Sequence, residues 1–148
     1  MPDSDDALKA LDQFVGEWTL SGGLVDPPIE MGGTTNFEWL EGGGFLLQST
    51  TTSREEFPNS ISAIGLDEGS GEYLMHYFDS RGVARVYEMS LNDGEWKLER
   101  EPSGPRSDFW QRWIGEFSDD VKTIEGRWEK SDDGSDWELD FPVTYTRA

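Results

Sequence analysis

The residues with the clearest chemical potential lie in one stretch, 73–91, which reads YLMHYFDSRGVARVYEMSL and holds the single histidine of the chain. Two apolar and aromatic runs flank an Asp-Ser-Arg-Gly turn, and this pattern predicts a β-hairpin. If Asp79 pairs with Gly82, then His76 faces Arg85, because opposed residues of an antiparallel pair point to the same side of the sheet. The hairpin would then place polar groups of several kinds side by side.

His76, Arg85 and Tyr87 are the candidate polar groups of this hairpin. His76 could act as a general acid or base, and an inward Arg85 could bind a ligand carboxylate with two parallel hydrogen bonds. Two alternatives stay open. His76 could be a hydrogen-bonded histidine of the core or rim, since a slip of one residue would turn it to solvent. Arg85 could point outward and pair with one of the many acidic side chains.

Tryptophans supply the second set of candidates. Trp39, Trp113, Trp128 and Trp137 could line a cavity that accepts a planar or aliphatic ligand. They could equally fill the interior, because large aromatic side chains are usually core. Arg112, with Gln111 and Trp113 beside it on the opposite face, is expected to point outward.

Other chemistries find little support in the sequence. The chain has no cysteine, so disulfides and thiolate sites are excluded, and no Gly-x-Ser-x-Gly elbow occurs. The acidic stretches 119–120 and 132–136 lack the ligand spacing of a calcium loop and are expected to be hairpin turns. We expect no metal site.

Length and charge limit the domain organisation and the partners. The 148 residues suit a single domain spanning 1–148, and 13% aromatic content is typical of a folded chain. The formal net charge is −19, which opposes binding to nucleic acid or to an anionic membrane. With no signal-like or membrane-spanning segment apparent, we expect a cytoplasmic protein; the oligomeric state is left open.

Periodicity predicts an all-β protein with one short N-terminal helix. Apolar residues at Leu8, Leu11, Phe14 and Val15 have helical spacing up to Gly16. Beyond that point the period changes to two, with turn signals every 8–12 residues. The expected strands are Glu17–Ser21, Thr34–Leu40, Phe45–Ser53, Ser60–Leu66, Tyr73–Phe78, Ala84–Leu91, Glu95–Glu101, Asp108–Phe117, Thr123–Lys130 and Asp136–Thr146.

Ten strands joined by short turns predict an up-and-down antiparallel β-barrel, because closure hides one apolar face and removes the sheet edges. In the last strand, Leu139 and Phe141 are expected to face inward, and Glu138 and Asp140 outward. Gly22–Gly33 is expected to be a long loop that could lie over a barrel mouth. A further break is expected at Pro102–Arg106.

Several motifs resemble those of calycin barrels, the group of lipocalins, fatty-acid-binding proteins and their bacterial relatives. Gly16-Glu17-Trp18 is similar to their Gly-x-Trp start, and Tyr145-Thr146-Arg147 resembles the end of many of them. The segments FEWLEGGGF, HYFDSRGVARVYEMSL and FSDDVKTIEGRWEKSDDGSDWELDFPVTYTR look like those of bacterial lipocalin-like proteins of unknown function. The resemblance implies structural roles for Gly16, Trp18 and Arg147, with Arg147 packed across Trp18 to close the bottom of the barrel.

The resemblance also bears on cofactor and function. The distantly similar nitrobindins take a haem-ligating histidine from near the C-terminus, where this chain has none, so we expect no cofactor and no haem. We predict a protein that binds a small hydrophobic or amphipathic ligand inside the barrel. The alternative is a small calycin-type enzyme, an isomerase, cyclase or hydrolase, that uses His76 as its acid or base.

Overall fold

The structure is a computed structural model that describes residues 4–25 and 28–148. It begins with a short helix of about two turns, α1 (Ser4–Ala10), followed by a 3-10 turn, η1 (Leu11–Phe14). Leu11 and Phe14 are fully buried against the barrel, as their spacing predicts, while Val15 is exposed because the helix has already ended. The predicted helix therefore exists but is shorter than expected, and its last turn is tighter.

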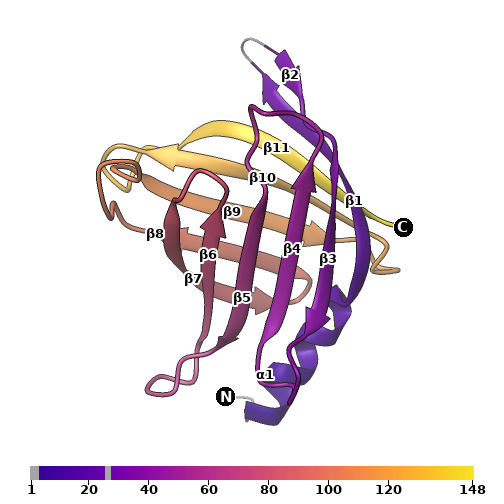
Figure 1. The fold of residues 1–148 in the computed structure, drawn as a ribbon. Coiled ribbons are helices and arrows are strands. Elements are labelled where there is room, and N and C mark those ends of the chain that lie inside the picture. The colour runs from indigo at the N-terminus through magenta and orange to yellow at the C-terminus, as the bar shows by residue number, and fades with distance from the viewer. Residues whose placement is uncertain (1–3, 26–27) are drawn as a thin grey trace.

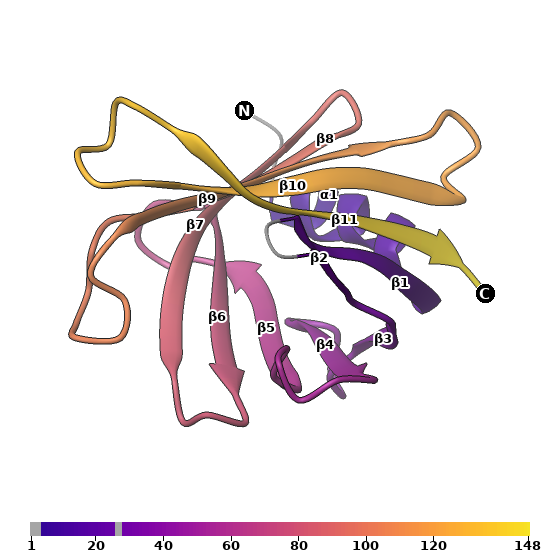
Figure 2. The ribbon, with the colours of Figure 1, turned by 90° about the horizontal axis from the view of Figure 1, so that it is seen from above.

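Ten strands form a closed antiparallel barrel, as the alternation of the sequence predicts (Figures 1 and 2). Each strand pairs with its neighbour in the chain, and the last strand pairs with the first to complete the ring. The strands, with one short additional strand β2, are β1 (Gly16–Val25), β2 (Pro28–Glu30), β3 (Gly33–Trp39), β4 (Leu46–Thr52), β5 (Ser60–Leu66), β6 (Tyr73–Asp79), β7 (Ala84–Asn92), β8 (Glu95–Arg100), β9 (Trp110–Phe117), β10 (Thr123–Ser131) and β11 (Glu138–Arg147).

The segment 22–33 is not the long loop that was expected. β1 continues to Val25, and β2 folds back on it with Gly23 opposite Glu30 and Leu24 opposite Ile29. Sequence patterning missed this hairpin because Gly22 and Gly23 read as turn residues. In Figure 1 the hairpin extends beyond the barrel at the end opposite α1.

The two ends of the barrel differ. We call the end that carries α1 the base, and the end that carries the loops 53–59, 80–83, 101–109 and 132–137 the mouth. Figure 1 places α1 below the strands at the base. Aromatic rings fill this end: the Phe14 ring lies 5.1 Å from that of Phe37 and 4.8 Å from that of Trp96. The base is thus a packed core, which leaves any open space to the mouth.

The Gly-x-Trp segment closes the base. The guanidinium carbon of Arg147 lies 4.0 Å from the centre of the Trp18 ring, so the expected contact between these residues is present. Arg147 also donates to the carbonyls of Gln13 and Val15 at 2.6 and 2.7 Å. Gly16 has a φ of 122°, and a Cβ there would lie 3.0 Å from Nη1 of Arg147. A larger residue at this position would therefore be strained and would crowd Arg147.

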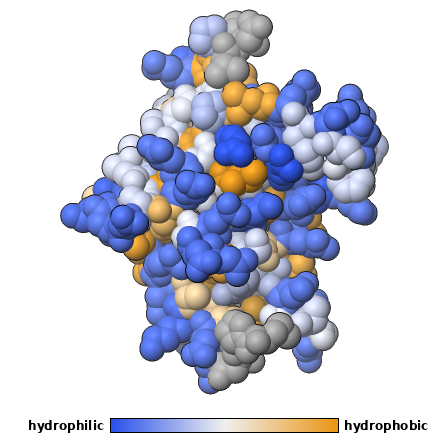
Figure 3. Space-filling view, turned by 180° about the vertical axis from the view of Figure 1, so that it is seen from behind, coloured by the Kyte–Doolittle hydropathy of each residue, from blue (hydrophilic) through white to orange (hydrophobic). Residues whose placement is uncertain are grey.

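The outer surface is mainly hydrophilic, as the face in Figure 3 shows. Arg112 points outward, as expected: its Nε donates to the carboxylate of Glu129 at 2.6 Å, and its guanidinium stacks 4.1 Å from the Trp137 ring. No helix among the described residues is long and apolar enough to cross a membrane.

Candidate functional site

The turn of the β6–β7 hairpin holds three residues rather than the two that were predicted. The N–H of Asp79 donates to the carbonyl of Val83 at 3.0 Å, and the N–H of Gly82 donates to the carbonyl of Asp79 at 2.9 Å. Gly82 has a φ of 80°, the left-handed conformation that closes such a loop. The predicted pairing of Asp79 with Gly82 is therefore wrong by one residue.

The corrected register moves the histidine to the outer wall. His76 lies opposite Val86 and is exposed, whereas Tyr77 lies opposite Arg85 and both of these side chains line the interior. The expectation that His76 faces Arg85 is wrong, because a shift of one residue exchanges the two faces of a strand. Arg85 and Tyr87 are buried, so the prediction that their side chains face the interior of the barrel is confirmed for both.

A second irregularity brings an acid into the barrel. In β11, Phe141 pairs with Trp128 and Leu139 pairs with Glu129, which leaves Asp140 as the extra residue of a β-bulge. Leu139 is consequently 47% exposed, and Asp140 lines the interior. The strict alternation that assigned Leu139 inward and Asp140 outward fails at this bulge.

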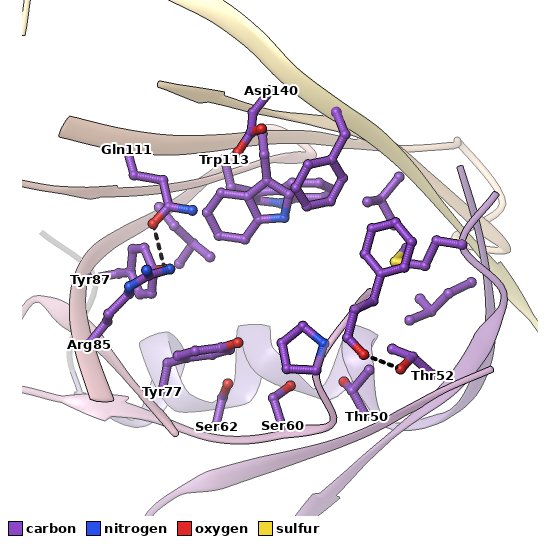
Figure 4. Close-up of a pocket in the computed structure, with 18 of the residues that line it drawn as sticks. Thr50, Thr52, Ser60, Ser62, Tyr77, Arg85, Tyr87, Gln111, Trp113 and Asp140 are labelled. Atoms are coloured by element: carbon purple, nitrogen blue, oxygen red, sulfur yellow. Dashed lines mark hydrogen bonds between the residues drawn. The ribbon is translucent and has the colours of Figure 1, made fainter. Parts of the chain in front are cut away.

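A cavity of about 360 Å³ occupies the mouth half of the barrel. Its lining includes the exposed residues Glu56, Arg81 and Arg106 of three mouth loops, so it is continuous with the outside. Figure 4 shows hydroxyl side chains along one wall and a group of polar and aromatic side chains facing them. The labelled members are Thr50, Thr52, Ser60, Ser62, Tyr77, Arg85, Tyr87, Gln111, Trp113 and Asp140.

Gln111 is the centre of the polar wall. Its Oε1 accepts two hydrogen bonds, one from the hydroxyl of Tyr87 at 2.9 Å and one from Nε of Arg100 at 2.8 Å. Arg100 is buried and donates through Nη1 to the carbonyls of Ser107 and Phe109. The network holds the side chains of β7, β8 and β9 in one arrangement before any ligand enters.

Arg85 belongs to the same wall and ties it to the mouth. Its Nε donates to Oγ of Ser107 at 2.8 Å, and its Nη2 donates to the carbonyl of Arg106 at 2.9 Å. Its guanidinium carbon lies 5.5 Å from the centre of the Phe109 ring, and that of Arg100 lies 4.6 Å from the same ring. Two buried cations therefore share one aromatic ring in the loop 101–109.

The aromatic part of the wall is built around Trp113. Its ring lies 5.5 Å from that of Trp96 and 5.4 Å from that of Trp128, and all three line the cavity. Gly115 and Gly126, which pair across β9 and β10, leave room for this indole. Trp39 lies elsewhere: its Nε1 donates to Asp12 next to the base, so it is not part of the cavity lining.

A smaller network lies at the mouth, beside the wall that carries the hydroxyl side chains of Thr50, Thr52, Ser60 and Ser62. Tyr77 donates to the carboxylate of Asp79 at 2.8 Å, and Arg81 forms an ion pair with the same carboxylate at 2.7 Å. Burial would raise the pKa of Asp79, but hydrogen bonds from Arg81, Tyr77 and the backbone outweigh it and lower the pKa to about 2. The carboxylate consequently stays ionised and keeps the phenol of Tyr77 as a donor.

The titratable groups inside the cavity have environments that fix their protonation. Burial raises the pKa of Tyr145 to about 12 and raises the pKa of Tyr87, so both phenols keep their protons. Burial also raises the pKa of Asp140, while the charges of Lys130 and Arg85 act in the opposite direction. Among the described residues, no three His, Asp or Glu side chains gather where they could hold a metal ion.

Of the ligand contacts expected from the sequence, Arg85, Tyr87, Trp113 and Trp128 come together around the cavity, and His76, Trp39 and Trp137 do not. Trp137 packs instead against the outward-pointing guanidinium of Arg112. The sequence reasoning missed Tyr77, Gln111 and Asp140. Tyr77 stands at an inward position that the correct register would have revealed. Gln111 was already placed on the face of Trp113, but its role depends on partners from the neighbouring strands. For Asp140 the available signal was Pro142, because a proline within a strand often accompanies an irregularity of the ladder.

Comparisons with known proteins bear on the fold. No family model matches the chain, and no curated protein matches it either. The chain is similar to the crystal structure of Rv2717c from M. tuberculosis, with a TM-score of 0.68, 13% sequence identity and 99% of each chain covered. At this identity the likeness extends to the fold alone, a barrel that could hold a ligand.

Proposed function

We propose that the protein binds a small hydrophobic or amphipathic molecule in the mouth half of its barrel. The observation that carries this proposal is the cavity of about 360 Å³, which lies among apolar rings and carries a few fixed polar groups. Pockets for small ligands have this size and this composition. Each 100 Å² of apolar ligand surface that enters would contribute about 2.5 kcal/mol to binding.

The packing of the barrel supports this function over a purely structural one. Rings fill the base, yet the mouth half stays open although Trp96, Trp113 and Tyr145 lie at its floor. Protein interiors are ordinarily packed without voids of this size. The preformed network around Gln111 also lowers the entropic cost of orienting a ligand. His76 lies on the outer wall, away from the cavity, and so cannot act as an acid or base on a ligand inside the barrel.

Phenylnaphthylamine, an uncharged dye that fluoresces in apolar surroundings, tests the proposal. We expect its emission to rise with the wild-type protein. The variant Ser62→Phe should abolish most of this rise, because Ser62 lies on β5, is buried and lines the cavity. Ser49→Phe is the matched control, since Ser49 lies on the neighbouring strand β4 and is exposed.

Circular dichroism would confirm that both variants fold. Equal dye emission from Ser62→Phe, Ser49→Phe and the wild type would show that the dye binds outside the cavity, and no emission from any of them would count against an open barrel. Either result overturns the proposal.

A further inference from the structure

The polar wall of the cavity includes two buried arginines that form no ion pair. Arg85 is 9% exposed and Arg100 is 5% exposed, and neither forms an ion pair with any acidic side chain among the described residues. Asp140 also lines the cavity, and the charge of Arg85 acts on its carboxyl group, but these two side chains form no ion pair. Two buried guanidinium groups thus lack an ion-pair partner, although buried charges are normally paired.

Within the part of the chain that the structure describes, Gln111 and Arg85 each keep one donor without an acceptor at the cavity. Because Oε1 of Gln111 accepts from both Tyr87 and Arg100, the amide nitrogen of Gln111 is the group left to face the cavity. In Figure 4 the nitrogen end of this side chain points toward the interior. Nε1 of Trp96, Nε1 of Trp113 and Nη2 of Arg100 also have no partner among the described residues, but these atoms are fully buried and are out of reach of a ligand in the cavity.

The charge of the whole chain makes this placement unusual. The protein has 12 basic residues against 31 acidic ones, yet Arg81, Arg85, Arg100 and Arg106 gather on one side of the mouth. The carbonyl of Arg81 accepts from Nη2 of Arg106 at 2.7 Å, which joins the two loops that carry them. Arg81 pairs with Asp79, whereas Arg85, Arg100 and Arg106 form no ion pair among the described residues, so their positive charge is left without a carboxylate partner.

We propose that the ligand carries an anionic oxygen-bearing group, a carboxylate, sulfonate or phosphate, which binds between the guanidinium of Arg85 and the amide nitrogen of Gln111. This inference rests on the proposed function and adds the chemical class of the ligand. The apolar part of the molecule lies against Trp113 and Trp128, and the anion accepts hydrogen bonds from the donors of Arg85 and Gln111 that face the cavity. Nη1 of Arg85, which makes no hydrogen bond with the described residues, is the donor available to it.

Two related dyes test the inference. Anilinonaphthalene sulfonate differs from phenylnaphthylamine by its sulfonate group, so the pair isolates the contribution of the anion. Arg85→Gln should weaken binding of the sulfonate dye at least about tenfold more than it weakens binding of the uncharged dye. Arg112→Gln is the matched control, because Arg112 is an arginine of the outer wall that pairs with Glu129; it should alter neither affinity.

The wild type provides a second measurement that does not depend on the folding of a variant. At fixed ionic strength, decanoate should displace the uncharged dye at a lower concentration than decanol does, because only decanoate carries an anion that Arg85 can bind; equal displacement by the two would contradict the inference. Equal losses of both dyes in Arg85→Gln, or equal losses in Arg85→Gln and Arg112→Gln, would overturn the inference while leaving an apolar binding cavity in place. If the uncharged dye itself fails to bind in the cavity, the proposed function fails first.

Discussion

Gly126→Ala is a one-methyl change that should disturb both the core and the cavity. A Cβ at Gly126 would lie 2.4 Å from two ring carbons of Trp113 and 2.8 Å from the carbonyl oxygen of Ile114. Restoring van der Waals separation requires the indole to move by about 1 Å. Trp113 is 1% exposed and is held between Trp96 and Trp128, so it has little space on the wall side.

Overpacking of this kind costs about 1–3 kcal/mol of unfolding free energy. With a urea slope of about 2 kcal/mol per molar, a loss of 2 kcal/mol would lower the unfolding midpoint by about 1 M. Because Trp113 lines the cavity, a displaced indole would occupy part of it, and we also expect weaker binding of the uncharged dye. Far-UV circular dichroism would follow the unfolding, and dye titration the binding.

Gly104→Ala is the matched control for the same chemical change. A Cβ at Gly104 meets no atom within 4 Å, and the glycine has no left-handed conformation. This variant should stay within about 0.5 kcal/mol of the wild type or gain slightly through lower entropy of the unfolded chain. The reasoning about Trp113 is refuted if Gly126→Ala and Gly104→Ala unfold at the same urea concentration and bind the dye equally.

Two further predictions concern the polar networks. Gln111→Leu should lower the unfolding free energy by about 3 kcal/mol, because the buried Tyr87 hydroxyl and Arg100 Nε lose their shared acceptor. Urea unfolding measures this loss. A loss below about 1 kcal/mol would mean that water replaces the amide oxygen as the acceptor. The pKa of Asp79 is lowered from 3.8 in the unfolded chain to about 2 in the folded protein. Its ionised carboxylate therefore contributes fully to stability above pH 3.8, and this contribution disappears as the pH falls toward 2. Asp79→Asn should therefore be less stable than the wild type near neutral pH, with the difference shrinking between about pH 4 and pH 2, and a pH-independent difference in unfolding midpoints would contradict this assignment.

The sequence predicts the barrel well because alternation repeats over ten strands, and one uncertain strand cannot change the architecture. It predicts the site less well, because the site depends on single residues. Asp-Ser-Arg-Gly is compatible with a loop of two or three residues, and only the contact between Asp79 and Val83 distinguishes them. That one residue decides whether His76 or Tyr77 faces Arg85.

The bulge at Asp140 shows the same limit. A bulge adds one residue without changing the composition of a strand, so period-two patterning continues past it in the wrong phase. Gln111 and Arg100 illustrate a different difficulty. Each lies in a strand that carries other polar residues, so its type does not indicate burial, and its burial depends on partners from neighbouring strands that a linear pattern does not pair.

The pairing of β1 with β11 has a consequence for the order in which the barrel folds. Nearly every other strand contact joins neighbours in the chain and can form early, whereas Arg147 meets Val15 across 132 residues. Until that seam closes, β1 and β11 remain open edges, and open edges invite pairing with other chains. The guanidinium of Arg147, stacked on Trp18, thus holds the last contact that turns an aggregation-prone curved sheet into a protected barrel.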